Sequence, residues 1–412
     1  MKSGISTSVL IFFIISFSPL RAQPPDLIIT RNLDKVDVPF EYINNFIVVK
    51  ILFNDIFPLK FILDTGAEHS ILTKREITDL MQVNYQRRFP ILGADLKTEL
   101  YAYLATGIRM KMNNLYFTNY PILVLEDDYF RFEEYAGIDV HGIIGADILR
   151  RFVIKINFDR QTITFYDPSV FRAPNSKFEV PKVWFKRSKP YIFSQIKLNN
   201  GKSVPVKLLM DTGASLSLMI HTNTDSLLEV PDHVVRSNIG MGLGGYLEGV
   251  IGRLPELNLC DNIYLNGVTT NFQDIQNVID TIYLNGRNGI VGNQVLSRFT
   301  IIIDYNKEKI YLQPNKHFHQ KFKYDRSGLS IISSGLSHNT FSISYVVTGS
   351  PAQDAGIKVG DEIKSINGLP ASIFSLEEVL YKLQGKIGKR IRLTLKRDGQ
   401  RIKITFRLRE LI

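Results

Sequence analysis

A four-residue motif, Asp-Thr-Gly-Ala, occurs twice in this chain of 412 residues, each time at the end of an apolar run. The first copy spans 64–67 and follows Phe61-Ile62-Leu63, and the second spans 211–214 and follows Leu208-Leu209-Met210. A given tetrapeptide is expected about once in ~10^5 positions, because each residue type makes up roughly one residue in twenty. Two copies in one chain therefore indicate a repeat, and they suggest two carboxylates that are built to face each other.

The sequence after each motif repeats in the same register. Gly145 ends an apolar-apolar-Gly unit 81 residues after Asp64, and Gly292 ends a second such unit 81 residues after Asp211. A β-type alternation of apolar residues and then a closing strand follow each glycine. Internal repetition on this scale indicates a duplicated domain. We expect two homologous lobes that are mainly β, with a short helix after each glycine.

Paired carboxylates can activate water for attack on a carbonyl carbon. Two carboxyl groups a few ångström apart cannot both ionise, so one keeps a proton at moderate pH and the pair titrates as one unit. The ionised member can take a proton from a shared water while the protonated member donates to the developing oxyanion. The glycine of each motif lets the backbone supply an N–H to the carboxylate, and each threonine hydroxyl can tie one loop to the other. A single copy would favour an Asx-type turn, but two copies in matched register favour the paired site.

The motif pair resembles that of the retropepsin-like aspartic peptidases, in which each lobe provides one catalytic aspartate and a downstream glycine strand braces the active-site loop. The resemblance covers residues 36–316 and implies that Asp64 and Asp211 are the catalytic dyad, with both lobes fused in one chain. The residues that it implies as loop supports are Thr65, Gly66, Ala67, Thr212, Gly213, Ala214, Gly145 and Gly292. Pepsin-type enzymes usually carry Ser or Thr after the glycine, where both motifs here carry Ala. Because that hydroxyl donor is missing, we expect a dyad that works nearer neutral pH than that of pepsin.

Members of that family close over substrate with a glycine-rich hairpin, the flap. Gly240 lies 29 residues after Asp211, and Gly93 lies 29 residues after Asp64. The expected flap residues are Gly93, Gly240, Met241, Gly242, Gly244 and Gly245. The second flap is richer in glycine, which predicts that the two flaps differ in mobility. This run also fits the dinucleotide-binding pattern G-x-G-x-x-G, but no helical periodicity follows it, so no such site is expected.

A third domain is expected from about Tyr324 onward, where turn signals alternate with short strands. A helix is predicted over 375–383, with Ser375 as its N-cap and Glu378 three residues on, and strands are expected at 391–395 and 402–406. Three short segments resemble segments of PDZ domains in exported bacterial proteases. They are Gly-Ser-Pro-Ala at 349–352, Ala-Gly at 355–356 and Gly-Asp-Glu-Ile at 360–363. The resemblance implies binding of a peptide C-terminus by β-augmentation. The best match to the carboxylate-capturing loop is Gly328, Leu329, Ser330 and Ile331. The alternative is a domain that only packs against the lobes.

The N-terminus predicts export. Lys2 precedes an apolar run over 9–17, and Arg21-Ala22 follows that run. These nine residues are fewer than the ~20 that span a bilayer, which is typical of a secretory signal peptide, here cleaved near Ala22. An uncleaved anchor is the alternative. No later segment is long enough to span a membrane, so we expect a periplasmic or secreted protein.

Composition argues against several functions. The net charge is +10, but the basic residues are scattered except over 386–409, and there is no regular aromatic-basic interleaving. Nucleic-acid binding is therefore not expected. The only cysteine, Cys260, cannot form an internal disulfide and is interpreted as a small buried hydrophobe. The seven histidines show no metal-ligand spacing and are interpreted as surface or cleft-rim residues. We expect a monomer without metal or cofactor.

These features predict a mainly β protein with two retropepsin-like lobes in a pseudo-two-fold bilobal protease, followed by an α+β PDZ domain. The expected boundaries are 1–22 for the signal peptide, 23–172 and 173–316 for the lobes, and 324–412 for the PDZ domain. The expected function is an aspartic endopeptidase that hydrolyses peptide bonds with water activated between Asp64 and Asp211, while the PDZ domain recruits or gates substrate. The alternative is a catalytically inactive protein that binds peptides in the cleft and the PDZ domain.

Overall fold

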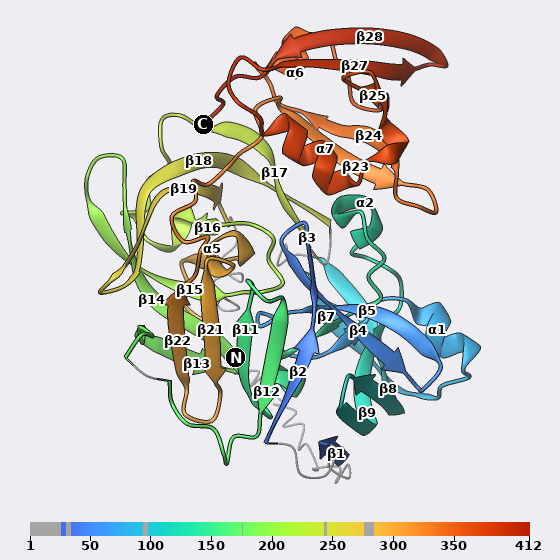
Figure 1. The fold of residues 1–412 in the computed structure, drawn as a ribbon, viewed down its shortest axis with the longest axis vertical. Helices are drawn as coiled ribbons and strands as arrows, with labels where there is room; N and C mark the ends of the chain where they lie inside the picture. Colours follow the sequence, from blue (N-terminus) through green and yellow to red (C-terminus); the bar gives the residue numbers. More distant parts are fainter. Residues whose placement is uncertain (1–25, 30–33, 94–97, 175, 243–244, 276–283) are drawn as a thin grey trace, which may run out of the picture.

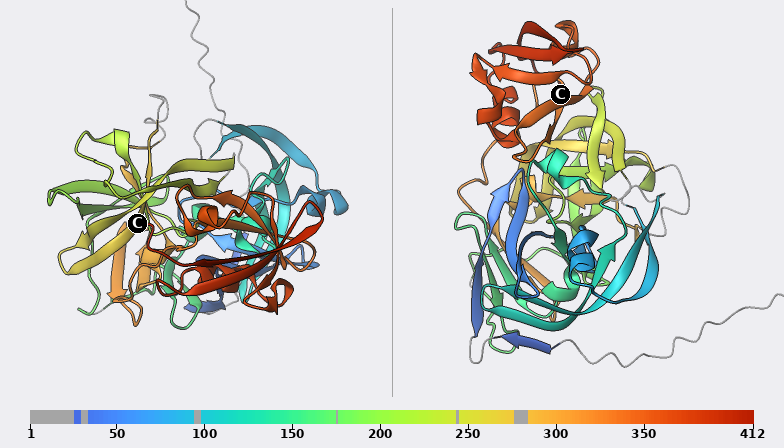
Figure 2. Two further views of the ribbon diagram at one scale, coloured as in Figure 1. Left: turned by 90° about the horizontal axis from the view of Figure 1, so that it is seen from above. Right: turned by 90° about the vertical axis from the view of Figure 1, so that its right-hand side faces the viewer.

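Two β lobes lie side by side, and a third β domain stacks on them (Figures 1 and 2). The computed structural model describes residues 26–29, 34–93, 98–174, 176–242, 245–275 and 284–412. The expectation of a mainly β fold is confirmed, since the helices of the described residues are all short. The signal peptide predicted over 1–22 lies outside the described residues. No described helix is both long and apolar enough to cross a membrane.

One large sheet forms most of the first lobe. Its strands run in the order β1-β9-β6-β10-β5-β4-β8-β7, and β3 pairs with β4. The strands are β1 (Asp26–Ile29), β3 (Glu41–Ile43), β4 (Phe46–Phe53), β5 (Phe57–Leu63), β6 (Ile71–Leu72), β7 (Tyr85–Leu92), β8 (Glu99–Met112), β9 (Leu115–Leu125) and β10 (Gly142–Ile144). The helices of this lobe are α1 (Arg75–Leu80), α2 (Phe132–Ala136) and α3 (Ala146–Leu149).

The second lobe repeats this arrangement in the order β13-β14-β15-β20-β16-β19-β18-β17. Its strands are β13 (Val183–Lys186), β14 (Lys189–Lys197), β15 (Ser203–Met210), β16 (Leu218–His221), β17 (Val235–Gly242), β18 (Gly245–Cys260), β19 (Ile263–Gln273) and β20 (Gly289–Val291). Helix α5 (Asn293–Leu296) and the 3-10 turn η1 (Thr222–Thr224) complete it. The helices α3 and α5 therefore lie where the repeat predicts a short helix after each glycine.

The apolar run before each aspartate is a buried strand beside the apolar-apolar-Gly unit. In the first lobe β10 pairs in parallel with β5, so that Ile144 lies beside Leu63. In the second lobe β20 pairs in parallel with β15, so that Val291 lies beside Met210. All four side chains are fully buried. Strands covered on both faces read as continuous apolar runs, which is why both segments lack polar alternation.

A five-stranded sheet joins the two lobes. Its order is β2-β12-β11-β21-β22, with β11 and β12 from the first lobe beside β21 and β22 from the second. These strands are β2 (Lys35–Pro39), β11 (Val153–Asn157), β12 (Thr162–Tyr166), β21 (Phe299–Asp304) and β22 (Lys309–Pro314). Ile156 pairs with Ile301 across the lobe boundary, and both are fully buried. The lobes therefore share a continuous core rather than merely touching.

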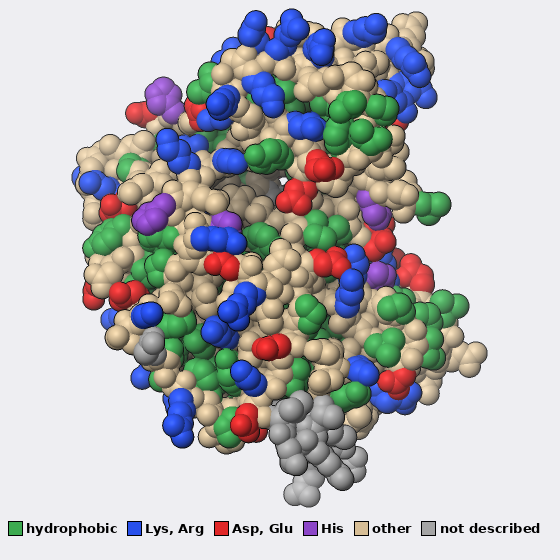
Figure 3. Space-filling view, in the orientation of Figure 1, with side chains coloured by type: hydrophobic (Ala, Val, Ile, Leu, Met, Phe, Trp, Pro, Cys, Tyr) green, Lys and Arg blue, Asp and Glu red, His purple; other side chains and the backbone are tan. Residues whose placement is uncertain are grey.

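The third domain has a core of its own. Its strands are β23 (Leu329–Ser334), β24 (Thr340–Val346), β25 (Glu362–Ile366), β26 (Leu369–Pro370), β27 (Arg390–Arg397) and β28 (Gln400–Arg407), with α6 (Pro351–Asp354), η2 (Ala371–Ile373) and α7 (Leu376–Leu383). The predicted helix is α7, and Ser375 and Glu378 form the expected capping box. Lys and Arg gather on this domain (Figure 3), because alternate residues of β27 and β28 such as Arg392 and Lys403 point outward while Ile391 and Phe406 are buried.

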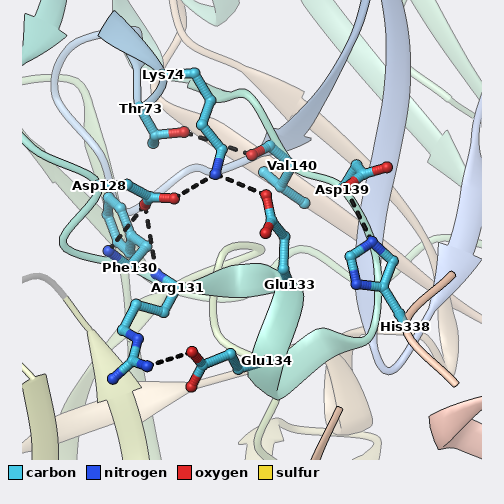
Figure 4. Close-up of polar contacts among 10 residues, drawn as sticks. All are labelled: Thr73, Lys74, Asp128, Phe130, Arg131, Glu133, Glu134, Asp139, Val140 and His338. Atoms are coloured by element: carbon cyan, nitrogen blue, oxygen red, sulfur yellow. Dashed lines mark hydrogen bonds and ion pairs between the residues drawn. The ribbon is translucent and has the colours of Figure 1, made fainter. Parts of the chain in front are cut away.

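Helix α2 of the first lobe lies against β23 of the third domain. The Ser333 hydroxyl donates to the Glu133 carbonyl at 2.7 Å, and His338 Nε2 lies 2.9 Å from Asp139 Oδ1. Behind this contact the Lys74 ammonium lies 2.6 Å from carboxylate oxygens of both Asp128 and Glu133 (Figure 4). The helix that meets the third domain is therefore itself fixed to the first lobe.

Candidate active site

The two Asp-Thr-Gly-Ala loops meet at the boundary between the lobes, and their threonines cross-link them. The Thr65 N–H donates to Thr212 Oγ1 at 3.0 Å, and the Thr212 N–H donates to Thr65 Oγ1 at 3.1 Å. Each hydroxyl then donates onward, Thr65 to the Met210 carbonyl at 2.6 Å and Thr212 to the Leu63 carbonyl at 2.8 Å. Both threonines are fully buried. The four bonds therefore fix the separation of the loops in a place without competing water.

The glycine of each loop faces the carboxylate of the other loop. A Cβ added at Gly66 would lie 2.6 Å from Asp211 Oδ2, and one at Gly213 would lie 2.4 Å from the Asp64 Cγ. No side chain can occupy either position without displacing a carboxylate. The two carboxylates therefore converge on the lobe boundary, as the paired motif predicts.

Backbone N–H groups hold each carboxylate in place. Asp64 Oδ1 accepts from the N–H of Gly66 at 2.7 Å and from that of Ala67 at 3.0 Å. Asp211 Oδ1 accepts from the Gly213 N–H at 2.8 Å, whereas the Ala214 N–H donates to the Asp211 backbone carbonyl at 3.3 Å. The two halves of the site are thus alike but not identical.

Burial and mutual repulsion raise the pKa of both carboxyl groups. Burial and the charge of Asp211 raise the pKa of Asp64 well above its usual value. Burial also raises the pKa of Asp211, but a hydrogen bond from Asp64, the Gly213 N–H and the charges of Arg287 and Lys189 oppose that rise. As pH rises, the pair therefore loses one proton and keeps the other over a range of pH. Such a pair can present a base and an acid at the same time.

The downstream glycines lie directly behind the loops. The Ile144 and Val291 carbonyls accept from the backbone N–H groups of Asp64 and Asp211, each at 3.0 Å. A Cβ at Gly145 would lie 2.5 Å from the His69 carbonyl carbon, and one at Gly292 would lie 2.4 Å from the Leu216 carbonyl oxygen. Both glycines thus allow the strand to pass close behind the motif loop.

The predicted flap residues lie on two hairpins. Gly240, Met241 and Gly242 lie in β17, and Gly245 begins β18, with Gly242 paired to Gly245. Gly244 lies outside the described residues. In the first lobe β7 and β8 form the equivalent hairpin, and Gly93 follows β7 with its N–H donating to the Thr98 carbonyl at 2.8 Å.

The residues predicted to capture a peptide carboxylate lie at the start of β23. Gly328 has φ of +81° and precedes the strand, which contains Leu329, Ser330 and Ile331. The half-buried Asp325 carboxylate accepts from the N–H of Ser327 at 3.1 Å and from that of Gly328. This loop is therefore organised around an internal carboxylate, and its capture of a peptide terminus stays a prediction.

Sequence reasoning missed Asn293 and misassigned His221 and Cys260. Asn293 Nδ2 donates to the Thr212 carbonyl at 2.6 Å and to the Asn45 carbonyl at 2.7 Å, and so links the lobes beside the motif loop. The equivalent residue of the first repeat is Ala146, and this polar substitution was the available signal. The interpretation of all histidines as surface or rim residues is wrong for His221, which is 2% exposed. The interpretation of Cys260 as buried is also inexact, since it is half-buried.

The described residues contain no group of three or more His, Cys, Asp or Glu side chains that could hold a metal ion. The expectation that the protein has no cofactor stays a prediction.

Comparisons with known proteins cover part of the first lobe and part of the third domain. Residues 49–148 match the family model described as Aspartyl protease, and residues 342–397 match the model described as PDZ domain. A Lactococcus lactis subsp. lactis protein named "Putative zinc metalloprotease LL2128" is 32% identical over 72 residues. That match covers 18% of this chain and 16% of the relative's length. The chain thus carries an aspartyl protease domain and a C-terminal PDZ domain.

Proposed function

We propose that this chain, with its aspartyl protease domain and PDZ domain, is an aspartic endopeptidase. The observation that carries the proposal is the pair of half-buried carboxylates of Asp64 and Asp211. Each lies against the glycine of the opposite loop, and the two threonines lock the loops together. The raised pKa of both carboxyl groups favours a pair that shares one proton near moderate pH.

The proposed reaction needs only these two groups and a water molecule. The ionised Asp211 takes a proton from the water as its oxygen forms a bond to the carbonyl carbon of the substrate. Asp64 donates its proton to the carbonyl oxygen, so that a neutral tetrahedral diol forms. Asp211 then gives its proton to the amide nitrogen while Asp64 regains one from a diol hydroxyl. The C–N bond breaks, and a carboxylic acid and an amine leave.

The PDZ domain is proposed to recruit or gate substrate. Its strand β23 lies at the edge of its sheet and pairs only with β24 among the described residues. Helix α7 lies beside that strand. A strand edge next to a helix is the arrangement that PDZ domains use to bind a peptide as an added strand, and here helix α2 of the first lobe lies against that strand. We also propose that the protein acts in the periplasm or outside the cell, as its N-terminal sequence predicts.

The two single substitutions Asp64→Asn and Asp211→Asn test the proposal. Each should lower kcat/KM for peptide cleavage by about 10^2–10^4-fold or more, because each removes either the acid or the base. The thermal unfolding midpoint should not fall, since neutralising one carboxyl relieves repulsion within a desolvated pair. Retention of cleavage by either folded variant would contradict the mechanism. A wild-type protein that cleaves no member of a diverse peptide library between acid and neutral pH would instead favour a peptide-binding protein.

A further inference from the structure

The two halves of the cleft differ at a position next to the candidate catalytic aspartates. In the first lobe β4 pairs with β5 so that Val48 lies opposite Ile62, and continuing this register places Phe46 opposite Asp64. In the second lobe β14 pairs with β15 so that Tyr191 lies opposite Leu209. Continuing that register places Lys189 opposite Asp211. Opposite residues of antiparallel strands have Cα atoms about 4.5–5.5 Å apart, and Lys189 lies within electrostatic range of both aspartates.

A second pair of equivalent positions is also apolar in the first lobe and positively charged in the second. Strand β10 starts at Gly142, which lies beside Phe61, and β20 starts at Gly289, which lies beside Leu208. Phe61 and Leu208 each stand three residues before the aspartate of their lobe, so the two glycines are equivalent positions. Two residues before each glycine stand Val140 in the first lobe and Arg287 in the second. Val140 is 1% exposed and packs in the same apolar cluster as Phe46. The first lobe thus presents an apolar pair where the second presents two cations.

These two cations face one negative charge on the dyad when the two aspartates share a proton, so one positive charge is left over. Among the described residues, Arg287 Nε is buried without a hydrogen-bond partner. The carboxylates within electrostatic range of Lys189 are Glu68 and the two aspartates themselves. The Glu68 carboxylate already has two other partners. Its oxygens lie 3.9 Å from Arg187 Nη1 and 3.9 Å from His69 Nε2.

Two like charges that are half-buried together are unfavourable for folding. Burial lowers the pKa of both Lys189 and Arg287, and the charge of Arg287 lowers the pKa of Lys189 further. Buried charges in proteins are normally paired. Two cations beside a dyad that carries one negative charge therefore indicate that a further anion arrives with a ligand.

We propose that Lys189 and Arg287 form a subsite for an acidic side chain of the peptide substrate, adjacent to the bond that is cleaved. The pseudo-symmetric subsite of the first lobe, lined by Phe46 with the buried Val140 behind it, then takes an apolar side chain on the other side of that bond. A guanidinium can bind a carboxylate through two parallel hydrogen bonds, and an ammonium adds a point charge. This inference rests on the proposed function and names its substrate class.

Four peptides test the subsite. They are matched in sequence and place Glu-Phe, Phe-Glu, Gln-Phe or Phe-Gln at the cleaved bond. In one of the two orders, the wild-type protein should cleave the Glu peptide about 10- to 100-fold more efficiently than its Gln counterpart, by kcat/KM. That ratio should fall toward one in Lys189→Met and in Arg287→Gln, and Lys189→Arg should retain part of it. Lys197→Met, which removes an exposed lysine at the other end of β14, is the matched control and should keep the ratio.

A binding measurement separates this inference from the proposed function. In the Asp64→Asn background, fluorescence anisotropy should show tighter binding of the labelled Glu peptide than of the Gln peptide, and Lys189→Met should abolish the difference. Equal cleavage and equal binding of Glu and Gln peptides in both orders would overturn the subsite while leaving the endopeptidase intact. A Glu preference in binding without any cleavage by the wild type would overturn the endopeptidase and keep the subsite. A preference for the Glu peptide that survives in both Lys189→Met and Arg287→Gln, with both variants folded, would also overturn the subsite.

Discussion

At the scale of single residues, Thr65 and Thr212 carry the connection between the two motif loops. Each hydroxyl accepts one N–H and donates to one carbonyl of the opposite lobe, and all partners are buried. Thr65→Val keeps the shape of the side chain but removes the hydroxyl, so the buried Thr212 N–H and the buried Met210 carbonyl lose their hydrogen-bond partner. We expect the free energy of unfolding of the lobes to fall by about 2–5 kcal/mol, with a loss of peptidase activity. Urea unfolding of the variant measures the first effect.

Thr65→Ser is the matched control for that substitution, because serine keeps the hydroxyl and loses only a methyl group. It should retain most of the stability and activity. Equal loss in the Ser and Val variants would assign the effect to packing rather than to the cross-lobe hydrogen bonds.

The charge of Lys189 sets which pH range the dyad can use. Lys189 and Arg287 both oppose the rise in the pKa of Asp211. Lys189→Met should therefore raise that pKa, and the acidic limb of the kcat/KM profile for a neutral peptide should move to higher pH. Lys197→Met removes the same charge far from the dyad and should leave the limb in place. A limb that does not move in Lys189→Met would show that the ammonium does not act on Asp211.

At the scale of elements, His221 at the end of β16 makes the second lobe sensitive to acid. Burial, together with the charge of Arg287, lowers its pKa from 6.5 to about 3. Between these values the unfolded chain binds a proton that the folded chain does not, so stability falls as pH drops from about 6.5 toward 3. By pH 4 this loss amounts to about 3 kcal/mol.

Replacing His221 with leucine removes this titration. The drop in thermal unfolding midpoint between pH 7 and pH 4 should therefore be smaller in His221→Leu than in the wild type. His233→Leu, at an exposed position, should leave the drop unchanged. An unchanged drop in His221→Leu would mean that other groups cause the acid sensitivity.

The elements that sequence predicts best are those with local signals. The strands before Asp64 and Asp211, the helix after Ser375 and its capping box all follow from short patterns. The pairing of β11 with β21 was not predictable, because Ile156 and Ile301 are far apart in sequence and either could have closed its own lobe. The position of Lys189 beside Asp211 was not predicted for a related reason. It depends on the register of β14 and β15 rather than on any sequence motif.

At the scale of the whole molecule, the first lobe and the third domain meet through a position that requires glycine. Gly137 ends α2 with φ of +65°, and a Cβ there would lie 2.9 Å from the Cβ of Leu376 at the start of α7. Ser333 of β23 bonds to the same helix through the Glu133 carbonyl. Because α7 and β23 border the edge at which a PDZ domain binds peptide, this contact couples the position of the groove to the first lobe.

Gly137→Ala should loosen this contact without unfolding either domain. The added methyl group meets the Cβ of Leu376, which no rotamer change can move, so α7 must shift away from α2. Gly201→Ala is the matched control, because Gly201 has φ of +85° and a Cβ there would meet nothing within 4 Å. Both variants bear the backbone strain of a left-handed alanine, about 1–2 kcal/mol, but only the first crowds the domain contact. Hydrogen–deuterium exchange should therefore be faster in β23 and α7 of Gly137→Ala than in Gly201→Ala, and equal exchange would show that the third domain holds its place by other contacts.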